Sequence, residues 1–115
     1  MSAGRPPWQV PVSLVLLLAM TPRPLRADTP VFDIEIRNHL FYPSALTVPA
    51  GTKVKLLVDN LDPTSEEFES YELNREKVIL GGRSAVIFIG PLRPGEYPFF
   101  GEFYPETAQG KITTE

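Results

Sequence analysis

The fold is decided by a stretch near the C-terminus, Gly95-Glu-Tyr-Pro-Phe-Phe-Gly-Glu-Phe-Tyr-Pro-Glu-Thr-Ala-Gln-Gly110. Its first half alternates as a strand does, with Tyr97 and Phe99 on one face, and Tyr97 is expected to make the corner hydrogen bond common in β-sandwiches. Pro105 sets a loop in the second half, and a short strand, residues 111–114, follows. A loop between the last two strands of a small all-β domain often carries function, because a rigid scaffold holds its side chains. We therefore expect this loop to form part of any site.

The N-terminal residues have the order of a secretory signal peptide. Arg5 precedes an apolar run, residues 10–20, which is too short to span a bilayer comfortably, and a polar segment ending in Ala27 follows. We predict cleavage after Ala27, which divides the chain into a signal peptide, residues 1–27, and a single domain, residues 28–115. The alternative is an uncleaved membrane anchor, since two arginines so near a cleavage site are unusual.

The predicted domain is acidic. Three of the 11 basic residues fall in the leader, whereas all 14 acidic residues follow it, so the domain carries a net charge of −6 with its one histidine neutral. This charge argues against nucleic acid as a partner, because phosphates demand positive charge, and suits metal cations or a basic protein surface.

The chain has no cysteine. Thiolate nucleophiles, redox pairs and soft sulfur ligands are thereby excluded.

Short extended segments separated by Pro and Gly turns recur along the domain. The expected strands are residues 32–37, 46–48, 52–60, 66–74, 78–80, 84–89, 95–100 and 111–114. Residues 38–43 are expected to turn the chain. Residues 66–74 could form a helix, which Glu and Leu favour, but strand or coil is expected, because Phe68, Tyr71 and the neighbouring strands favour extended structure. Strands at this spacing, without a long amphipathic helix, predict an all-β antiparallel sandwich or barrel.

Three pieces of the chain together resemble the cupredoxins. The first is Phe41-Tyr-Pro-Ser-Ala-Leu-Thr-Val-Pro-Ala-Gly51, which is followed by a strand that ends in Asn60. The second is Pro94-Gly-Glu-Tyr-Pro-Phe99, and the third is Gly110-Lys-Ile112. More narrowly, residues 66–77 and 99–110 are similar to the EfeO-type cupredoxin-like proteins found beside bacterial high-affinity iron permeases. The resemblance implies a cupredoxin-like Greek-key β-sandwich in the periplasm, with either copper binding or a part in ferrous iron uptake.

The resemblance does not extend to a blue-copper site, which needs two histidines, a cysteine and usually a weak axial methionine. Gly101 stands where the family has its cysteine, Gln109 stands near the methionine position, and Glu67 stands about where the first histidine would be. A conventional blue-copper electron carrier is excluded by residue type. In iron-associated relatives the resemblance implies a histidine after Gly-Glu-Phe, where this chain has Tyr104.

Oxygen and nitrogen donors nevertheless gather near these positions. The predicted metal ligands are His39, Glu67, Glu69, Glu102 and Tyr104. Carboxylate and imidazole donors suit iron, manganese or copper(II) better than copper(I), because harder donors select harder ions. The predicted cofactor is therefore a copper or an iron ion.

The histidine and the glutamates among these donors also have purely structural interpretations. His39 can lie in a turn and bond backbone groups, and Glu102 can form an ion pair with Arg75 or Lys77. The glutamates of residues 66–72 can form a solvated acidic edge that prevents strand pairing with other chains. This edge is the role expected above all for Glu72 and Glu66.

The leading hypothesis is a periplasmic metal-binding accessory protein of a high-affinity iron uptake system. Its partner would be an iron permease or a periplasmic iron-binding protein, and it would meet the membrane only through such a partner. The alternative is a metal-free module that docks a basic partner through its acidic loops, an association that weakens with salt. Catalysis extends at most to metal-dependent oxidation of ferrous iron, because one histidine and no cysteine provide no hydrolase or transferase site.

Overall fold

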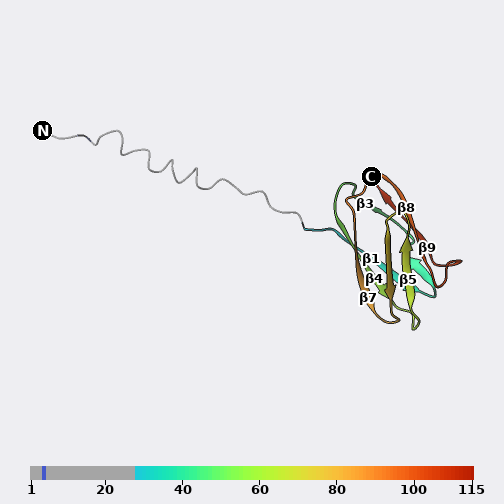
Figure 1. Cartoon of the computed structure of the whole chain (residues 1–115). Helices are drawn as coiled ribbons and strands as arrows, with labels where there is room; N and C mark the ends of the chain where they lie inside the picture. The colour runs from blue at the N-terminus through green and yellow to red at the C-terminus, as the bar shows by residue number, and fades with distance from the viewer. Residues whose placement is uncertain (1–3, 5–27) are drawn as a thin grey trace.

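The structure of the chain is a computed structural model that describes Gly4 and residues 28–115. Every regular element in this part of the chain is a β-strand, and the strands form two facing layers (Figure 1). The predicted all-β sandwich is therefore confirmed. The predicted signal peptide, Gly4 apart, lies outside the described residues, and its cleavage stays a prediction. The described residues include no helix with the length and apolar character needed to cross a membrane.

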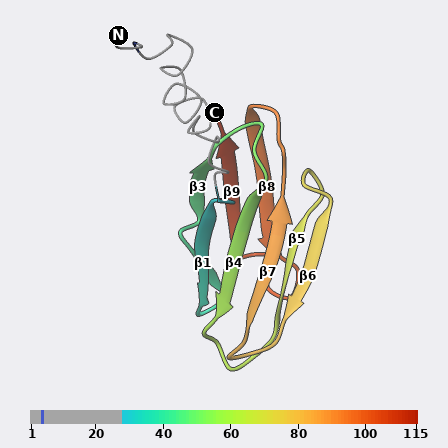
Figure 2. The same cartoon turned by 90° about the vertical axis from the view of Figure 1, so that its left-hand side faces the viewer.

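Four strands form the first sheet and five form the second (Figure 2). The first sheet has the order β2 (Leu40–Tyr42), β1 (Val31–Arg37), β4 (Val54–Asn60) and β7 (Ser84–Ile89). The second sheet has the order β3 (Ala45–Val48), β9 (Gln109–Thr114), β8 (Gly95–Gly101), β5 (Glu66–Ser70) and β6 (Arg75–Ile79).

Both sheets are mixed, which corrects the expectation of a wholly antiparallel sandwich. β1 runs parallel to β4, and β3 runs parallel to β9, whereas the other pairings are antiparallel. The reason lies in the connections. Between β1 and β4 the chain visits the second sheet as β3, and it returns to the first sheet in its original direction. Long connections of this kind permit the parallel pairs that hairpins cannot make.

Two local expectations also need correction. Residues 38–43 contain a short strand, β2, because a left-handed turn at Asn38 and His39 reverses the chain early enough for pairing with β1. The segment 66–74 is extended only as far as Ser70. It then turns, with Asn74 in the left-handed region at φ 54° that Asn tolerates well, and β6 begins at the next residue.

The core lies between the sheets and is filled from both inner faces, as the alternation of apolar residues predicts. Its aromatic centre consists of Phe68 stacked on Phe99, with ring centroids 4.9 Å apart, and Phe41 edge-on to Phe99 at 5.0 Å. The predicted corner bond is present, since the Tyr97 hydroxyl donates to the Arg93 carbonyl over 2.8 Å. The aromatic contacts hold Phe99 of β8 in the core, and the corner bond ties the start of β8 to the turn that precedes it.

Candidate cation site

Strand β5 places glutamates on both of its faces. Glu66 points inward with Phe68, whereas Glu67 and Glu69 point outward, as the alternating burial along the strand shows. The antiparallel partner β6 sets Glu76 directly opposite Glu69. Like charges opposite one another in a sheet repel and destabilise the pairing. The outer face of this hairpin therefore carries an unfavourable contact between two negative charges.

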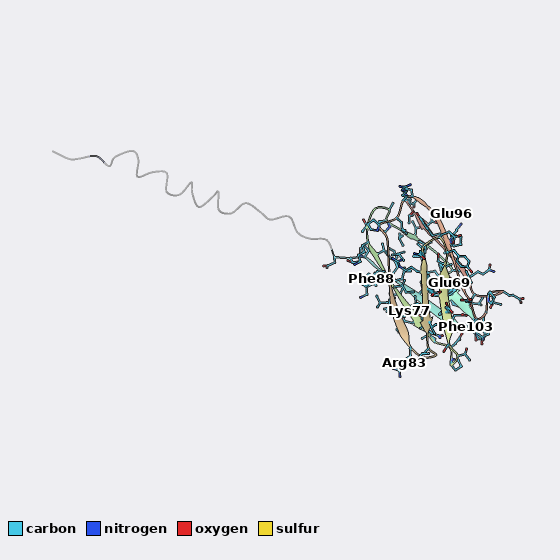
Figure 3. The ribbon with its side chains drawn as sticks, viewed as in Figure 1. Glu69, Lys77, Arg83, Phe88, Glu96 and Phe103 are labelled. Atoms are coloured by element: carbon cyan, nitrogen blue, oxygen red, sulfur yellow. The ribbon has the colours of Figure 1, made fainter. Side chains whose placement is uncertain are left out.

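Glu102 joins these side chains from the loop that follows β8. Its backbone N–H donates to the Glu67 carbonyl over 2.9 Å, and its carboxyl group lies close enough to that of Glu67 to raise the pKa of Glu67. Carboxylate oxygens of Glu67, Glu69 and Glu76 all lie within 4.8 Å of one another. We call Glu67, Glu69, Glu76 and Glu102 the glutamate cluster. It lies on the outer face of the second sheet, and Figure 3 shows Glu69 and Phe103 on the side of the domain away from Phe88 of the first sheet.

The crowding of these carboxylates perturbs their acidity. The pKa of Glu67 is raised above its ordinary value, first by partial burial and then by the charge of Glu102 and the hydrogen bond with it. The pKa of Glu69 is raised as well, by partial burial and by the opposing Glu76. Both shifts report first the cost of removing these carboxylates from water and then the cost of holding several negative charges together, and a bound cation would reduce both costs.

One carboxylate oxygen of Glu69 lacks, among the described residues, any group that would offset its negative charge. This atom, Oε2, is buried and has no hydrogen-bond partner in the structure. A surface hollow of about 310 Å³ adjoins the cluster and shares two of its carboxylates; it is lined by Glu69, Ser70, Tyr71, Asn74, Arg75 and Glu76. Oxygen donors alone, several of them anionic, are the ligands that hard cations prefer. The arrangement can therefore hold a hard metal ion close to the surface.

The structure brings three of the predicted ligands together and pairs the other two elsewhere. Glu67, Glu69 and Glu102 belong to the cluster, whereas the His39 ring stacks on the Tyr104 ring with centroids 3.5 Å apart. His39 lies in the turn before β2, as its structural interpretation expects. Its N–H donates to Asp62 over 2.9 Å, and its carbonyl accepts the Thr107 hydroxyl over 3.0 Å.

Two further alternatives are also decided by geometry. Arg75 donates its Nε–H to the Phe88 carbonyl over 2.8 Å, and the ion pairs within residues 28–115 do not include Glu102. Glu102 is thus surrounded by acidic groups, without the basic partner considered for it. Glu72 is exposed, as a solvated acidic edge requires, but Glu66 is only 1% exposed, so that expectation was wrong for Glu66.

Glu66 fills the space in which a thiolate-bound copper would need its cysteine. A β-carbon on Gly101 would lie 2.6 Å from Glu66 Oε2 and 2.7 Å from the β-carbon of Ala108, so a side chain at position 101 has no room. Gln109 uses its amide to donate to the Pro105 carbonyl over 3.0 Å. The side chains at the end of β8 include no thiolate, and this donor set does not fit blue copper.

Comparison with known proteins adds the family context. The model of the family described as "Cupredoxin-like domain" matches residues 10–114. An uncharacterized protein of Rickettsia prowazekii (strain Madrid E) is 47% identical over 79 residues, which are 69% of this chain and 63% of that protein. The chain thus spans less than two thirds of the length of that relative.

Solved structures of copper proteins share the architecture. The metal-binding domain of the Cu(I)-exporting P-type ATPase CopA of Streptococcus pneumoniae D39 superposes with a TM-score of 0.69 at 16% identity, covering 80% of this chain and 91% of that domain. Auracyanin A, a blue copper protein of Chloroflexus aurantiacus, superposes with a TM-score of 0.64 at 14% identity, covering 76% of this chain and all of that chain. At such identities the likeness shows the fold alone.

Proposed function

Because this chain belongs to the cupredoxin-like domain family and carries a carboxylate cluster without sulfur donors, we propose that it binds a hard metal cation, iron foremost, at the glutamate cluster. The observation that carries the proposal is the convergence of carboxylate oxygens of Glu67, Glu69 and Glu76 within 4.8 Å of one another, with the Glu102 carboxyl group beside Glu67. Within residues 28–115 none of these four carboxyl groups has an ion-pair partner, so a bound cation would relieve the repulsion among them.

The position of the cluster fits transfer of the ion to another protein. Glu76 and Glu102 are exposed, so a bound ion would be reachable from outside the domain. We place the domain in the periplasm as an accessory protein of iron uptake, which presents the ion to a permease or to an iron-binding protein of the same system. Support comes from the signal-like N-terminus, from the acidic charge, and from the resemblance of residues 66–77 and 99–110 to iron-associated relatives.

Calorimetric titration of the purified protein with Fe(II) under nitrogen, and separately with Mn(II) and Cu(II), tests the proposal. We expect binding of one ion per chain, lost in the double variant E67Q/E102Q. The matched control is E72Q, which removes one negative charge from an exposed glutamate of the same region that lies outside the cluster. Binding that E72Q weakens as much as the double variant does would indicate diffuse charge attraction and would contradict a defined site.

The same experiment separates this function from docking of a basic protein. If the unmodified protein takes up none of the three ions, the cation-binding proposal is wrong. A salt-sensitive association with a basic partner would then become the better explanation of the cluster, because exposed charge pairs weaken as ionic strength rises.

A further inference from the structure

Glu66 is a buried carboxylate that the cation site does not use directly. It is the first residue of β5, it is 1% exposed, and it points into the sandwich with Phe68, away from the outward-facing glutamates. Burial of a carboxyl group is costly unless the group is hydrogen-bonded. The contacts of Glu66 therefore indicate what it does in the fold.

Its two oxygens have different surroundings. Oε1 accepts two backbone hydrogen bonds of 2.9 Å, one from the N–H of Glu67 and one from the N–H of Phe103. Oε2 is buried, has no hydrogen-bond partner among the residues that the structure describes, and lies 2.6 Å from the point that a β-carbon on Gly101 would occupy. The carboxylate thus fills the interior beneath the loop 102–108 and binds that loop through a single atom.

The two N–H groups that donate to Glu66 belong to the backbone that carries the glutamate cluster. One belongs to Glu67, and the other belongs to Phe103, the residue after Glu102. Between them, the Glu102 N–H donates to the Glu67 carbonyl over 2.9 Å. The loop 102–108 and β5 are therefore joined by two hydrogen bonds, donated by the consecutive N–H groups of Glu102 and Phe103. Both bonds lie next to Glu67 and Glu102, whose carboxylates belong to the glutamate cluster.

From this arrangement we infer that Glu66 is the positioning residue of the cation site: its buried carboxylate fixes Glu67 and Glu102 so that their side chains meet on the outer face. The inference rests on the proposed function. Glu66 itself is not a ligand, since its side chain is on the opposite face of β5 from the cluster. Residues that orient metal ligands change affinity without touching the ion.

The test compares two substitutions of Glu66 with a control of similar burial. E66L removes the acceptor and leaves the two amides without a partner, whereas E66Q keeps an acceptor oxygen of the same size. The control is T114V, which removes the 2.6 Å bond from the buried Thr114 hydroxyl to the Arg93 carbonyl. Thr114 pairs with Gly95, at the end of β8 remote from Gly101. Each protein is titrated with Mn(II) at a temperature at which circular dichroism shows it folded.

We expect E66L to weaken Mn(II) binding by about tenfold or more, as loss of a ligand-orienting residue does, and E66Q to recover most of the affinity. T114V should lower the melting temperature and leave the affinity unchanged. Equal Mn(II) affinity in E66L and the unmodified protein would overturn the inference, because Glu66 would then have only a structural role.

A second measurement does not depend on cation binding. Amide hydrogen exchange at Phe103 and Glu67 should accelerate in E66L and return towards the original rate in E66Q, with no change in T114V. If the unmodified protein binds no Mn(II) or Fe(II), the proposed function fails, and these exchange rates alone decide whether Glu66 holds the loop. Unchanged protection of the Phe103 amide in E66L would contradict the role assigned to Glu66.

Discussion

The carboxyl carbon of Glu66 lies 2.5 Å from the point that a β-carbon on Gly101 would occupy, so the two residues are sterically matched. Position 101 cannot gain a side chain while Glu66 stays in place, and Glu66 needs the space that the glycine provides. Gly101 is required here by close packing, since its φ is not among the positive values found at other glycines. The pairing explains how the end of β8 is packed without a cysteine side chain at position 101.

The substitution G101A should therefore destabilise the protein by about 1–3 kcal/mol, the usual cost of overpacking a core. Part of this loss should be recovered in G101A/E66A, because removal of the carboxylate opens the space that the new methyl group needs. Urea unfolding of both single variants and the double variant gives the coupling free energy. Strictly additive effects would show that the two side chains do not compete for the same space.

Much of the fold could be predicted from the sequence because its signals are local. Alternation along residues 32–37 and 54–58 identified the buried faces, and Ile34, Ile36, Leu56 and Val58 are fully buried. The parallel pairings of β1 with β4 and of β3 with β9 were not predicted, since they depend on which sheet each strand joins after a long connection. Periodicity within a strand carries no information about that choice.

The residues of the candidate site could likewise be predicted only where the signal is local in the sequence. Glu67, Glu69 and Glu102 were identified from residue type and position, but Glu76 was missed because the turn after Ser70 was not recognised. A hairpin prediction for residues 66–79, with Asn74 as the left-handed turn residue, would have placed Glu76 opposite Glu69. The inward direction of Glu66 follows from the register of β5, which a run of adjacent glutamates conceals.

The raised pKa values of Glu67 and Glu69 predict that acid stabilises the metal-free protein. Above their ordinary value of 4.5, and up to their folded pKa values, the native state binds more protons than the unfolded state does. The contribution of these groups to the unfolding free energy therefore rises as the pH falls through this window, and the gain is complete below it. Chemical denaturation from about pH 7 to about pH 4 should show a gain that E67Q/E69Q lacks. Identical pH profiles would mean that the cluster carries no repulsion.

Cation binding and stability should change in opposite directions in the double variant E67Q/E102Q. Without metal, it should be more stable than the unmodified protein, because like charges have been removed. With Mn(II) at about 100 times its Kd, the unmodified protein should gain about 2.7 kcal/mol, and the variant should gain nothing. Thermal unfolding with and without Mn(II) measures both effects. Equal stabilisation of the two proteins by Mn(II) would place the ion elsewhere on the chain.

The last prediction concerns His39, which lies outside the cluster although imidazole is the better-known metal ligand. Its ring stacks on Tyr104, and its Nδ1 lies 3.5 Å from Asp62 Oδ2, so replacement should weaken the turn before β2 and leave the glutamates in place. H39A should lower the unfolding free energy by about 0.5–1.5 kcal/mol, the usual worth of an aromatic pair, without changing the Mn(II) or Fe(II) affinity. Y104A should cost more, because Tyr104 also packs against the hydrophobic core, but it should likewise leave the affinity unchanged. Loss of affinity in H39A, but not in Y104A, would show that imidazole is a ligand and that the loop brings it to the cluster when the ion binds.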